Sequence, residues 1–197
     1  MLNRKIDNEI DAHFSNSKKA LFLTGARQVG KTYSIRKYAK RHGLNLIEFN
    51  FLLQPETMDI INGAGDVKEL LLRISAYSRV PLVRSKTLIF FDEVQECPDV
   101  MTWVKALVDE GSYIYALSGS LLGVELKDIR SVPVGYMSEM QVYPMDFEEF
   151  VSAVGVPENV LDAVKKSWSE KTLVDAYIHE KMMQLFQLYI IVGGMPA

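Results

Sequence analysis

Short apolar runs alternate with segments of helical periodicity along most of the chain. Five of these runs have the length and composition of β-strands: residues 20–23, 44–50, 88–91, 113–117 and 139–143. Between them, apolar side chains recur at intervals of three and four residues, as expected of helices that cover a sheet. This alternation predicts an α/β fold, with a parallel, doubly wound sheet of about five strands and helices on both faces.

The predicted helices have polar or glycine signals at their ends. Four of them are expected before Pro144: within residues 1–19, between Lys31 and Gly43, over residues 66–77, and from Pro98 to Gly111. The segment between residues 51 and 65 is expected to be a loop, because it contains a proline and two closely spaced glycines.

From Pro144 on, the pattern is wholly helical. Asp146 and Glu149 have the spacing of a capping box, and Thr172 and Asp175 repeat this spacing ahead of a long helix. We therefore expect two parts, a core with an N-terminal helix and a small helical lid or connector: residues 1–145 and 146–197.

The segment between the first predicted strand and its helix fits the pattern Gly-x4-Gly-Lys-[Ser/Thr] at every constrained position. Its residues are Gly25, Ala26, Arg27, Gln28, Val29, Gly30, Lys31 and Thr32. Backbone N–H groups of such a loop converge on phosphates at a helix N-terminus, and the glycines allow a close approach. Lys31 is expected to reach the β- and γ-phosphates, and the Thr32 hydroxyl to bind Mg²⁺. A chance glycine turn is disfavoured, because a strand precedes the loop and a helix follows it.

A second motif lies where residues 88–91 end in two adjacent carboxylates, Asp92 and Glu93. An apolar run without charges is typical of a buried parallel strand, and ligands of open α/β sheets bind at the carboxyl ends of such strands. Asp92 is expected to hold Mg²⁺ through water, and Glu93 to polarise the water that attacks the γ-phosphate. A solvated acidic turn is the alternative for this motif taken alone; the phosphate-binding loop in the same chain favours catalysis.

The strand predicted over residues 113–117 is followed by Ser118 and Ser120. In P-loop ATPases with an Asp-Glu pair, the next strand commonly lies between the acidic strand and the P-loop strand. Its tip then faces the γ-phosphate. Ser118 is our candidate for sensing that phosphate and Ser120 the alternative, while an ordinary Ser-Gly turn explains the pattern about as well.

Composition narrows the class of protein. With 197 residues, 48% of them apolar, the chain can bury one substantial core and a small appended part. A single cysteine, Cys97, excludes an intramolecular disulfide and suits a reducing compartment. No secretion signal is visible, no apolar stretch is long enough to span a bilayer, and the three histidines lack metal-ligand spacing. We therefore expect a cytoplasmic protein with no membrane partner and no structural metal.

The charge is unevenly distributed. Residues 1–45 contain ten basic and three acidic side chains, although the whole chain has a net charge of −3. A nucleic-acid partner and a solvated helix face both explain the basic side chains outside the P-loop, and we favour the solvated face: Lys18, Lys19, Arg36, Lys37, Lys40 and Arg41.

With these motifs placed, the chain resembles the ATPase domain of a large bacterial and archaeal family of AAA-superfamily ATP-binding proteins. Members usually carry a C-terminal nuclease-like domain of unknown function. The resemblance rests on four short stretches that are spread over most of the chain: residues 24–32, 91–98, 117–120 and 143–150. Residues 191–196 resemble a segment that members follow with a connector and that C-terminal domain. The resemblance therefore implies that this domain is missing from the chain.

One position departs from the family pattern. Many members place Gly-Arg where this chain has Gly135 and Tyr136, and that arginine is a candidate for stabilising the transferred phosphoryl group. Its absence implies slow hydrolysis, or an arginine supplied by Arg130 or by a neighbouring subunit of an oligomer.

Two functions remain open. The first is Mg²⁺-dependent ATP binding and hydrolysis coupled to a conformational change, with Lys31, Glu93 and Ser118 as the catalytic group. The second is a nucleotide-gated regulatory module that binds DNA or protein with little turnover. A small-molecule kinase is less favoured because the Asp-Glu pair suits water activation, and no Asn-Lys-x-Asp motif for guanine recognition is present.

Overall fold

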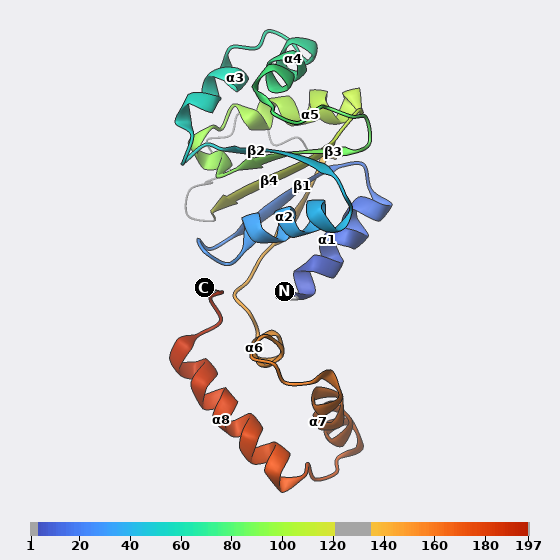
Figure 1. The fold of residues 1–197 in the computed structure, drawn as a ribbon, viewed down its shortest axis with the longest axis vertical. Helices are drawn as coiled ribbons and strands as arrows, with labels where there is room; N and C mark the ends of the chain where they lie inside the picture. The colour runs from blue at the N-terminus through green and yellow to red at the C-terminus, as the bar shows by residue number, and fades with distance from the viewer. Residues whose placement is uncertain (1–3, 121–134, 197) are drawn as a thin grey trace. The chain divides into compact units, whose positions relative to one another are not determined.

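The structure is a computed structural model that describes residues 4–120 and 135–196. A parallel sheet of five strands in the order β2-β3-β4-β1-β5 is its central element (Figure 1). The strands are β1 (Ala20–Gly25), β2 (Asn45–Asn50), β3 (Thr87–Asp92), β4 (Ile114–Ser120) and β5 (Met137–Gln141). The α/β fold with a parallel sheet, predicted from the alternation of apolar runs and helices, is confirmed, and β4 lies between β3 and β1 as expected.

The fifth strand lies two residues earlier than predicted. Its pairing with β1 aligns Met137 with Ala20, so the start of β1 determines where β5 begins. The N–H of Val142 still donates to the carbonyl of Thr24 at 2.7 Å, after which the chain leaves the sheet. Apolar composition alone marked the later part of this strand, whereas the hydrogen-bonded ladder includes the polar residues before it.

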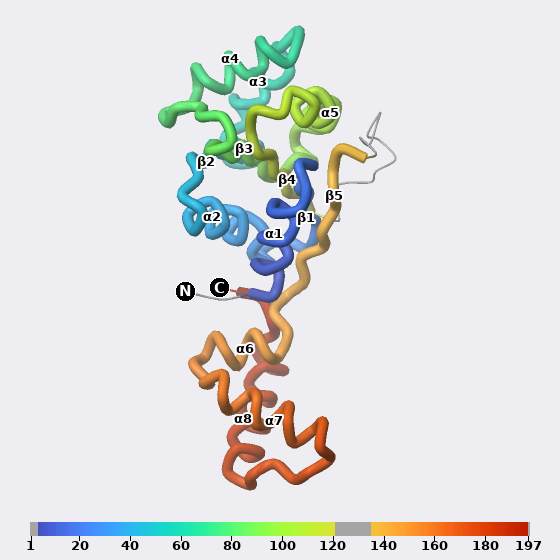
Figure 2. The backbone as a smooth tube through the Cα atoms, turned by 90° about the vertical axis from the view of Figure 1, so that its right-hand side faces the viewer, coloured from blue at the N-terminus to red at the C-terminus, as the bar shows by residue number. Residues whose placement is uncertain are grey.

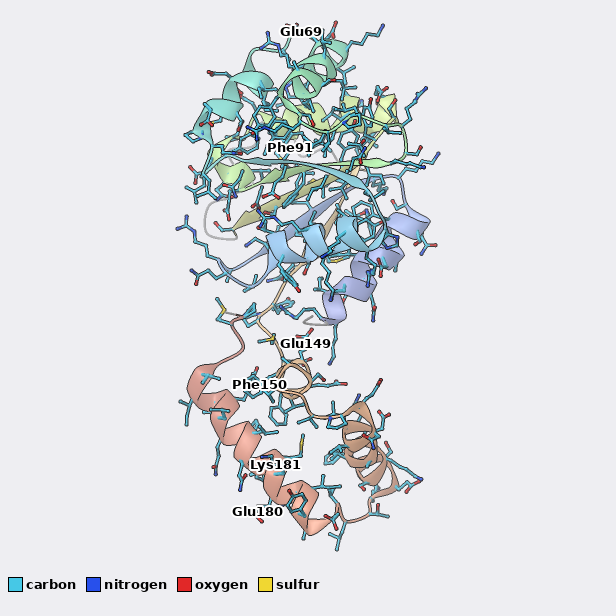
Figure 3. The ribbon with its side chains drawn as sticks, viewed as in Figure 1. Glu69, Phe91, Glu149, Phe150, Glu180 and Lys181 are labelled. Atoms are coloured by element: carbon cyan, nitrogen blue, oxygen red, sulfur yellow. The ribbon has the colours of Figure 1, made fainter. Side chains whose placement is uncertain are left out.

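Helices cover both faces of the sheet. On one face lie α3 (Met58–Asn62), α4 (Val67–Tyr77) and α5 (Val100–Glu110); on the other lies α2 (Lys31–Arg41), packed against the later part of α1 (Lys5–Asn16) (Figures 1 and 2). Alternate strand residues face the first group of helices and form a buried core with them. Phe22, Phe49, Phe91 and Leu117 belong to this core, and Figure 3 labels Phe91 within it.

The segment expected to be a loop between residues 51 and 65 contains a short 3₁₀ turn, η1 (Pro55–Thr57), and α3. Ile61 of α3 is almost fully buried in the same core. A five-residue helix shows too little periodicity to be recognised in the sequence, and its burial depends on contacts with distant residues.

The chain divides into two compact units, residues 9–142 and residues 1–8 with 143–197. The second unit contains α6 (Phe147–Ala153), α7 (Glu158–Glu170) and α8 (Ala176–Val192), with Phe150 and Val151 in its small core. The capping box predicted for Asp146 and Glu149 is present at α6. The repeat of this motif is wrong at Thr172, because α8 begins after Asp175, whose carboxylate accepts the first helical N–H groups. The expected boundary after residue 145 stays a prediction.

Within residues 4–120 and 135–196, no helix combines the length and the apolar character that crossing a bilayer requires.

Candidate nucleotide-binding site

The phosphate-binding pattern folds as a tight loop between β1 and α2. Gly25 has φ of 148°, and a Cβ atom there would lie 2.3 Å from the carbonyl oxygen of Val142. Gly30, with φ of 96°, precedes the first turn of α2. Gln28 also has a positive φ of 64°, which few residues other than glycine adopt. Two glycines and one strained residue thus shape a loop that ends at a helix N-terminus.

The side chain of Lys31 folds back and contacts the backbone of this loop. Its ammonium group donates to the carbonyl oxygens of Gly25 at 3.1 Å and Ala26 at 2.8 Å, and the residue is 4% exposed. Burial lowers the pKa of Lys31, and the nearby carboxylates of Glu93 and Asp92 oppose that shift. The cation is therefore enclosed by the loop and bound to its carbonyl oxygens, and anionic phosphates would be complementary to it.

Asp92 is the centre of a buried hydrogen-bond network. Its Oδ2 accepts from the hydroxyl of Thr32 at 2.9 Å and from the amide of Asn50 at 2.8 Å, and its Oδ1 accepts from the hydroxyl of Ser118. Asp92 is 1% exposed. Burial raises its pKa, while the hydrogen bonds from Ser118 and Thr32 lower it in part. Four elements thus meet at one carboxylate: β2, β3, β4 and α2.

Glu93 follows directly, and its backbone turns sharply. Its φ of 58° is left-handed, and it leads into a 3₁₀ turn, η2 (Val94–Glu96). The carboxylate is half-buried and accepts a hydrogen bond from the side-chain amide of Gln95, with Nε2 and Oε2 2.5 Å apart. Asp92 and Glu93, adjacent in sequence, therefore have different surroundings: Asp92 is enclosed by donors, and Glu93 lies at the edge of the site.

The structure brings together three side chains that the sequence motifs identified separately, Thr32, Asp92 and Ser118. Sequence reasoning missed Asn50 and Gln95. A detectable signal existed for Asn50, a polar residue at the carboxyl end of a predicted strand, but no motif indicated its partner. Ser120, the alternative to Ser118, contributes its backbone N–H, which donates to Oε1 of Gln95 at 3.3 Å.

Position 136, where the family resemblance implies an arginine, lies at the opposite end of β1 from the loop. The N–H of Ala20, the first residue of β1, donates to the carbonyl of Tyr136 at 3.0 Å, whereas the loop follows Gly25, the last. The ammonium of Lys105 lies over the Tyr136 ring, 5.4 Å from its centroid. A side chain at position 136 therefore cannot reach phosphates held by the same loop. The other candidate, Arg130, lies outside the described residues.

The oxygen ligands available at the site suit a magnesium ion that is bound together with phosphates. No cluster of three or more His, Cys, Asp or Glu side chains suited to a metal ion occurs among residues 4–120 and 135–196. Thr32 and Asp92 offer one hydroxyl and one carboxylate, 2.9 Å apart, and Mg²⁺ commonly binds one or two carboxylates plus substrate phosphates and water.

Some of the basic side chains of residues 1–45 form ion pairs with acidic side chains. Arg36 makes two hydrogen bonds to Glu48, at 2.7 and 2.6 Å, and both Arg41 and His42 contact Asp11. These ion pairs lie on or near the surface and support the interpretation of a solvated helix face for Arg36 and Arg41. The prediction is wrong for Lys37, which is buried.

Comparison with known proteins agrees with this geometry. Residues 17–151 match the AAA domain, and the chain therefore belongs to this family of P-loop ATPases. The sequence has no significant match among curated proteins.

Solved structures are similar to this chain at low sequence identity. The Walker-type ATPase of Pyrococcus abyssi is 15% identical, with a TM-score of 0.54, over 100% of this chain and 65% of that one. The ORC1 protein of Aeropyrum pernix, solved in complex with DNA, is 15% identical with a TM-score of 0.45, over 85% and 54%. Cdc6p of Pyrobaculum aerophilum is 13% identical with a TM-score of 0.48, over 78% and 49%. The chain spans less than two thirds of each of these relatives.

Proposed function

We propose that the chain binds ATP with Mg²⁺ and hydrolyses it to ADP and phosphate, and that turnover is coupled to a conformational change. One observation carries the proposal: the first turn of α2 and the end of β3 meet directly, with Thr32 Oγ1 2.9 Å from Asp92 Oδ2. A glycine-shaped loop and a buried lysine lie beside that contact.

Each residue has a role that follows from its chemistry. The N–H groups of the loop and the ammonium of Lys31 bind the phosphates, since both are donors that complement anionic oxygen. Thr32 and Asp92 hold Mg²⁺, which when bound neutralises charge on the β- and γ-phosphates. Glu93 orients and polarises the attacking water. Ser118 senses the γ-phosphate. Its hydroxyl donates to Asp92, so both side chains lie at the carboxyl ends of the strands, where the phosphates are expected to bind.

Two further proposals rest on the family resemblance. We infer from it that a C-terminal nuclease-like domain works with this ATPase domain, and that residues 146–197 act as a helical lid or connector. We also propose slow turnover, because Tyr136 stands in place of an arginine that, at the end of β1 opposite the loop, could only complete the site of a neighbouring subunit.

The direct test measures Mg²⁺-dependent ATP and GTP binding and hydrolysis by the parent, Lys31→Ala and Glu93→Gln proteins. Lys31→Ala should weaken ATP binding by about 30-fold or more, because a charge-assisted contact is lost. Glu93→Gln should keep the Kd for ATP and lower kcat by about 10²–10⁴-fold, the range of general base catalysis. Lys40→Ala is the matched control, since Lys40 lies on the same helix and is exposed.

The outcomes separate the alternatives. Equal ATP binding by the parent and Lys31→Ala would show that the site is assigned wrongly. A parent that binds ATP without turnover, and a Glu93→Gln variant that responds to ATP like the parent in a partner-binding assay, would favour the nucleotide-gated regulatory module instead.

A further inference from the structure

The side chain of Gln95 connects two parts of the site that no sequence motif links. Its Nε2 lies 2.5 Å from Oε2 of Glu93, and its Oε1 accepts the backbone N–H of Ser120, the last residue of β4, at 3.3 Å. A Cβ atom on Gly119 would lie 3.3 Å from the same Oε1, which places the amide close against the β4 backbone. One amide therefore spans the space between Glu93 and the tip of β4.

The chemistry of the two partners determines how this amide is oriented. An ionised carboxylate is only an acceptor and a backbone N–H is only a donor, so the NH₂ group must face Glu93 and the oxygen must face Ser120. A glutamate at position 95 would place a second carboxylate against Glu93, and an alanine would leave both partners without the contact. Among the common side chains of this length, glutamine alone serves both neighbours.

The backbone around Gln95 is built to present this side chain. The left-handed conformation of Glu93 starts the turn, and the N–H of Glu96 donates to the carbonyl of Glu93 at 3.0 Å. Val94 and Cys97, on either side, are buried in the sheet core and anchor the turn. Gln95 is thereby directed back over Glu93 and toward β4.

From this geometry we infer that Gln95 is a positioning residue, which holds the carboxylate of Glu93 in place and couples it to β4. The inference rests on the proposed function, in which Glu93 polarises water and Ser118 on β4 senses the γ-phosphate. Movement of the β4 tip by a bound phosphate would then shift the water-activating carboxylate through a single amide.

The first experiment tests the contact without using turnover. The side-chain amide of Gln95 is assigned in ¹⁵N-labelled protein by comparison with Gln95→Ala, and its NMR resonances are compared between the parent, Glu93→Ala and Glu96→Ala. They should shift in Glu93→Ala, which removes the acceptor of the Nε2 hydrogen bond, and should stay as in the parent in Glu96→Ala. Gln95 amide resonances that are the same in the parent and in Glu93→Ala overturn the inference.

The second experiment tests positioning. Gln95→Ala should lower kcat for ATP hydrolysis by about 10–100-fold while the Kd for ATP changes less than about twofold, since only the transition state loses an interaction. Gln95→Glu should lower kcat at least as much as Gln95→Ala, because a second carboxylate beside Glu93 repels it and donates no hydrogen bond to it. Glu96→Ala, an exposed position in the same turn, is the control and should behave like the parent.

The two proposals fail in different ways. If the parent protein has no ATPase activity while the Gln95 amide resonances shift in Glu93→Ala, the proposed function is wrong and the contact stands. If the parent hydrolyses ATP while Gln95→Ala and Gln95→Glu have the parent's kcat, the positioning role is wrong and the ATPase assignment stands.

Discussion

The hydroxyl of Ser118 donates a hydrogen bond to Oδ1 of Asp92, and both residues are almost fully buried. This contact connects the ends of β4 and β3. Oδ2 of the same carboxylate accepts hydrogen bonds from Thr32 and Asn50. Both oxygens of Asp92 are therefore used within the protein, and an uncompensated carboxylate at this depth would be costly. The stability and the proposed chemistry of the site depend on the same residue.

Replacement of Ser118 by alanine should lower the free energy of unfolding by about 1–2 kcal/mol, because Asp92 loses a buried hydrogen-bond donor. Urea denaturation followed by circular dichroism measures this change. Ser120→Ala, on the same strand, is the control: it keeps the backbone N–H that donates to Gln95, and it should cost less than Ser118→Ala because it removes no donor from Asp92. Equal costs for the two variants would contradict the importance of the Ser118 contact.

Asp92 should make the stability of the ligand-free protein depend on pH. Because burial raises its pKa above 3.8, the folded protein binds this proton more tightly than the unfolded chain. The contribution is fully present below pH 3.8 and is lost as the pH rises through the folded-state pKa. Asp92→Asn should therefore be more stable than the parent at pH 7, by about 1 kcal/mol, since a neutral amide replaces a buried charge.

The advantage of Asp92→Asn should shrink as the pH is lowered, which thermal unfolding at several pH values would show. Asp109→Asn, at an exposed position of α5, is the matched control and should have little effect at any pH. A variant that is less stable than the parent at pH 7 would contradict the expected cost of the Asp92 charge.

Gly25 should tolerate no side chain. Gly25→Ala would place Cβ 2.3 Å from the carbonyl oxygen of Val142, so the backbone of the loop or of the segment after β5 must move. We expect a loss of about 3 kcal/mol in the free energy of unfolding, together with loss of ATP binding. Gly43→Ala is the comparison: its φ is also positive, but no atom lies within 4 Å of its Cβ position, and it should cost about 1 kcal/mol.

Two adjacent glutamates of α6 should differ strongly in their effect on the second unit. The Glu149 carboxylate accepts the N–H groups of Lys5 at 2.7 Å and Asp146 at 3.1 Å, and lies 3.1 Å from Nε of the buried Arg4. Glu149→Ala should cost about 3 kcal/mol, because a buried cation and two N–H groups lose their partner.

Glu148 supplies the control for that change. It contacts Lys5 and Lys165 at the surface, so Glu148→Ala should cost less than about 1 kcal/mol. Hydrogen exchange of the α6 amides reports both effects locally. Similar exchange rates in the two variants would show that the buried contact with Arg4 does not stabilise this unit.

Much of the fold was predictable because its signals are local. Short runs rich in apolar residues marked all five strands, and Asp66 and Gly111 marked helix ends that the structure confirms. The misplaced parts depend on other parts of the chain. The start of β5 follows from its pairing with β1, and α3 exists because Ile61 fits into a core built by four strands and two longer helices.

The sequence by itself determined the chemistry that is available: a glycine-shaped loop before a lysine and a threonine, and a strand that ends in two carboxylates. These are short-range patterns: the residues are neighbours in the chain, and their spacing alone indicates a phosphate-binding loop and a strand that ends in acidic residues. The tertiary structure decided which residues complete the group. Asn50 and Ser118 contact Asp92 because the sheet order places β2 and β4 on either side of β3, and Gln95 spans from Glu93 to β4 because a left-handed turn directs it there. Such contacts join residues that are far apart in the chain, and their geometry exists only after the strands have paired.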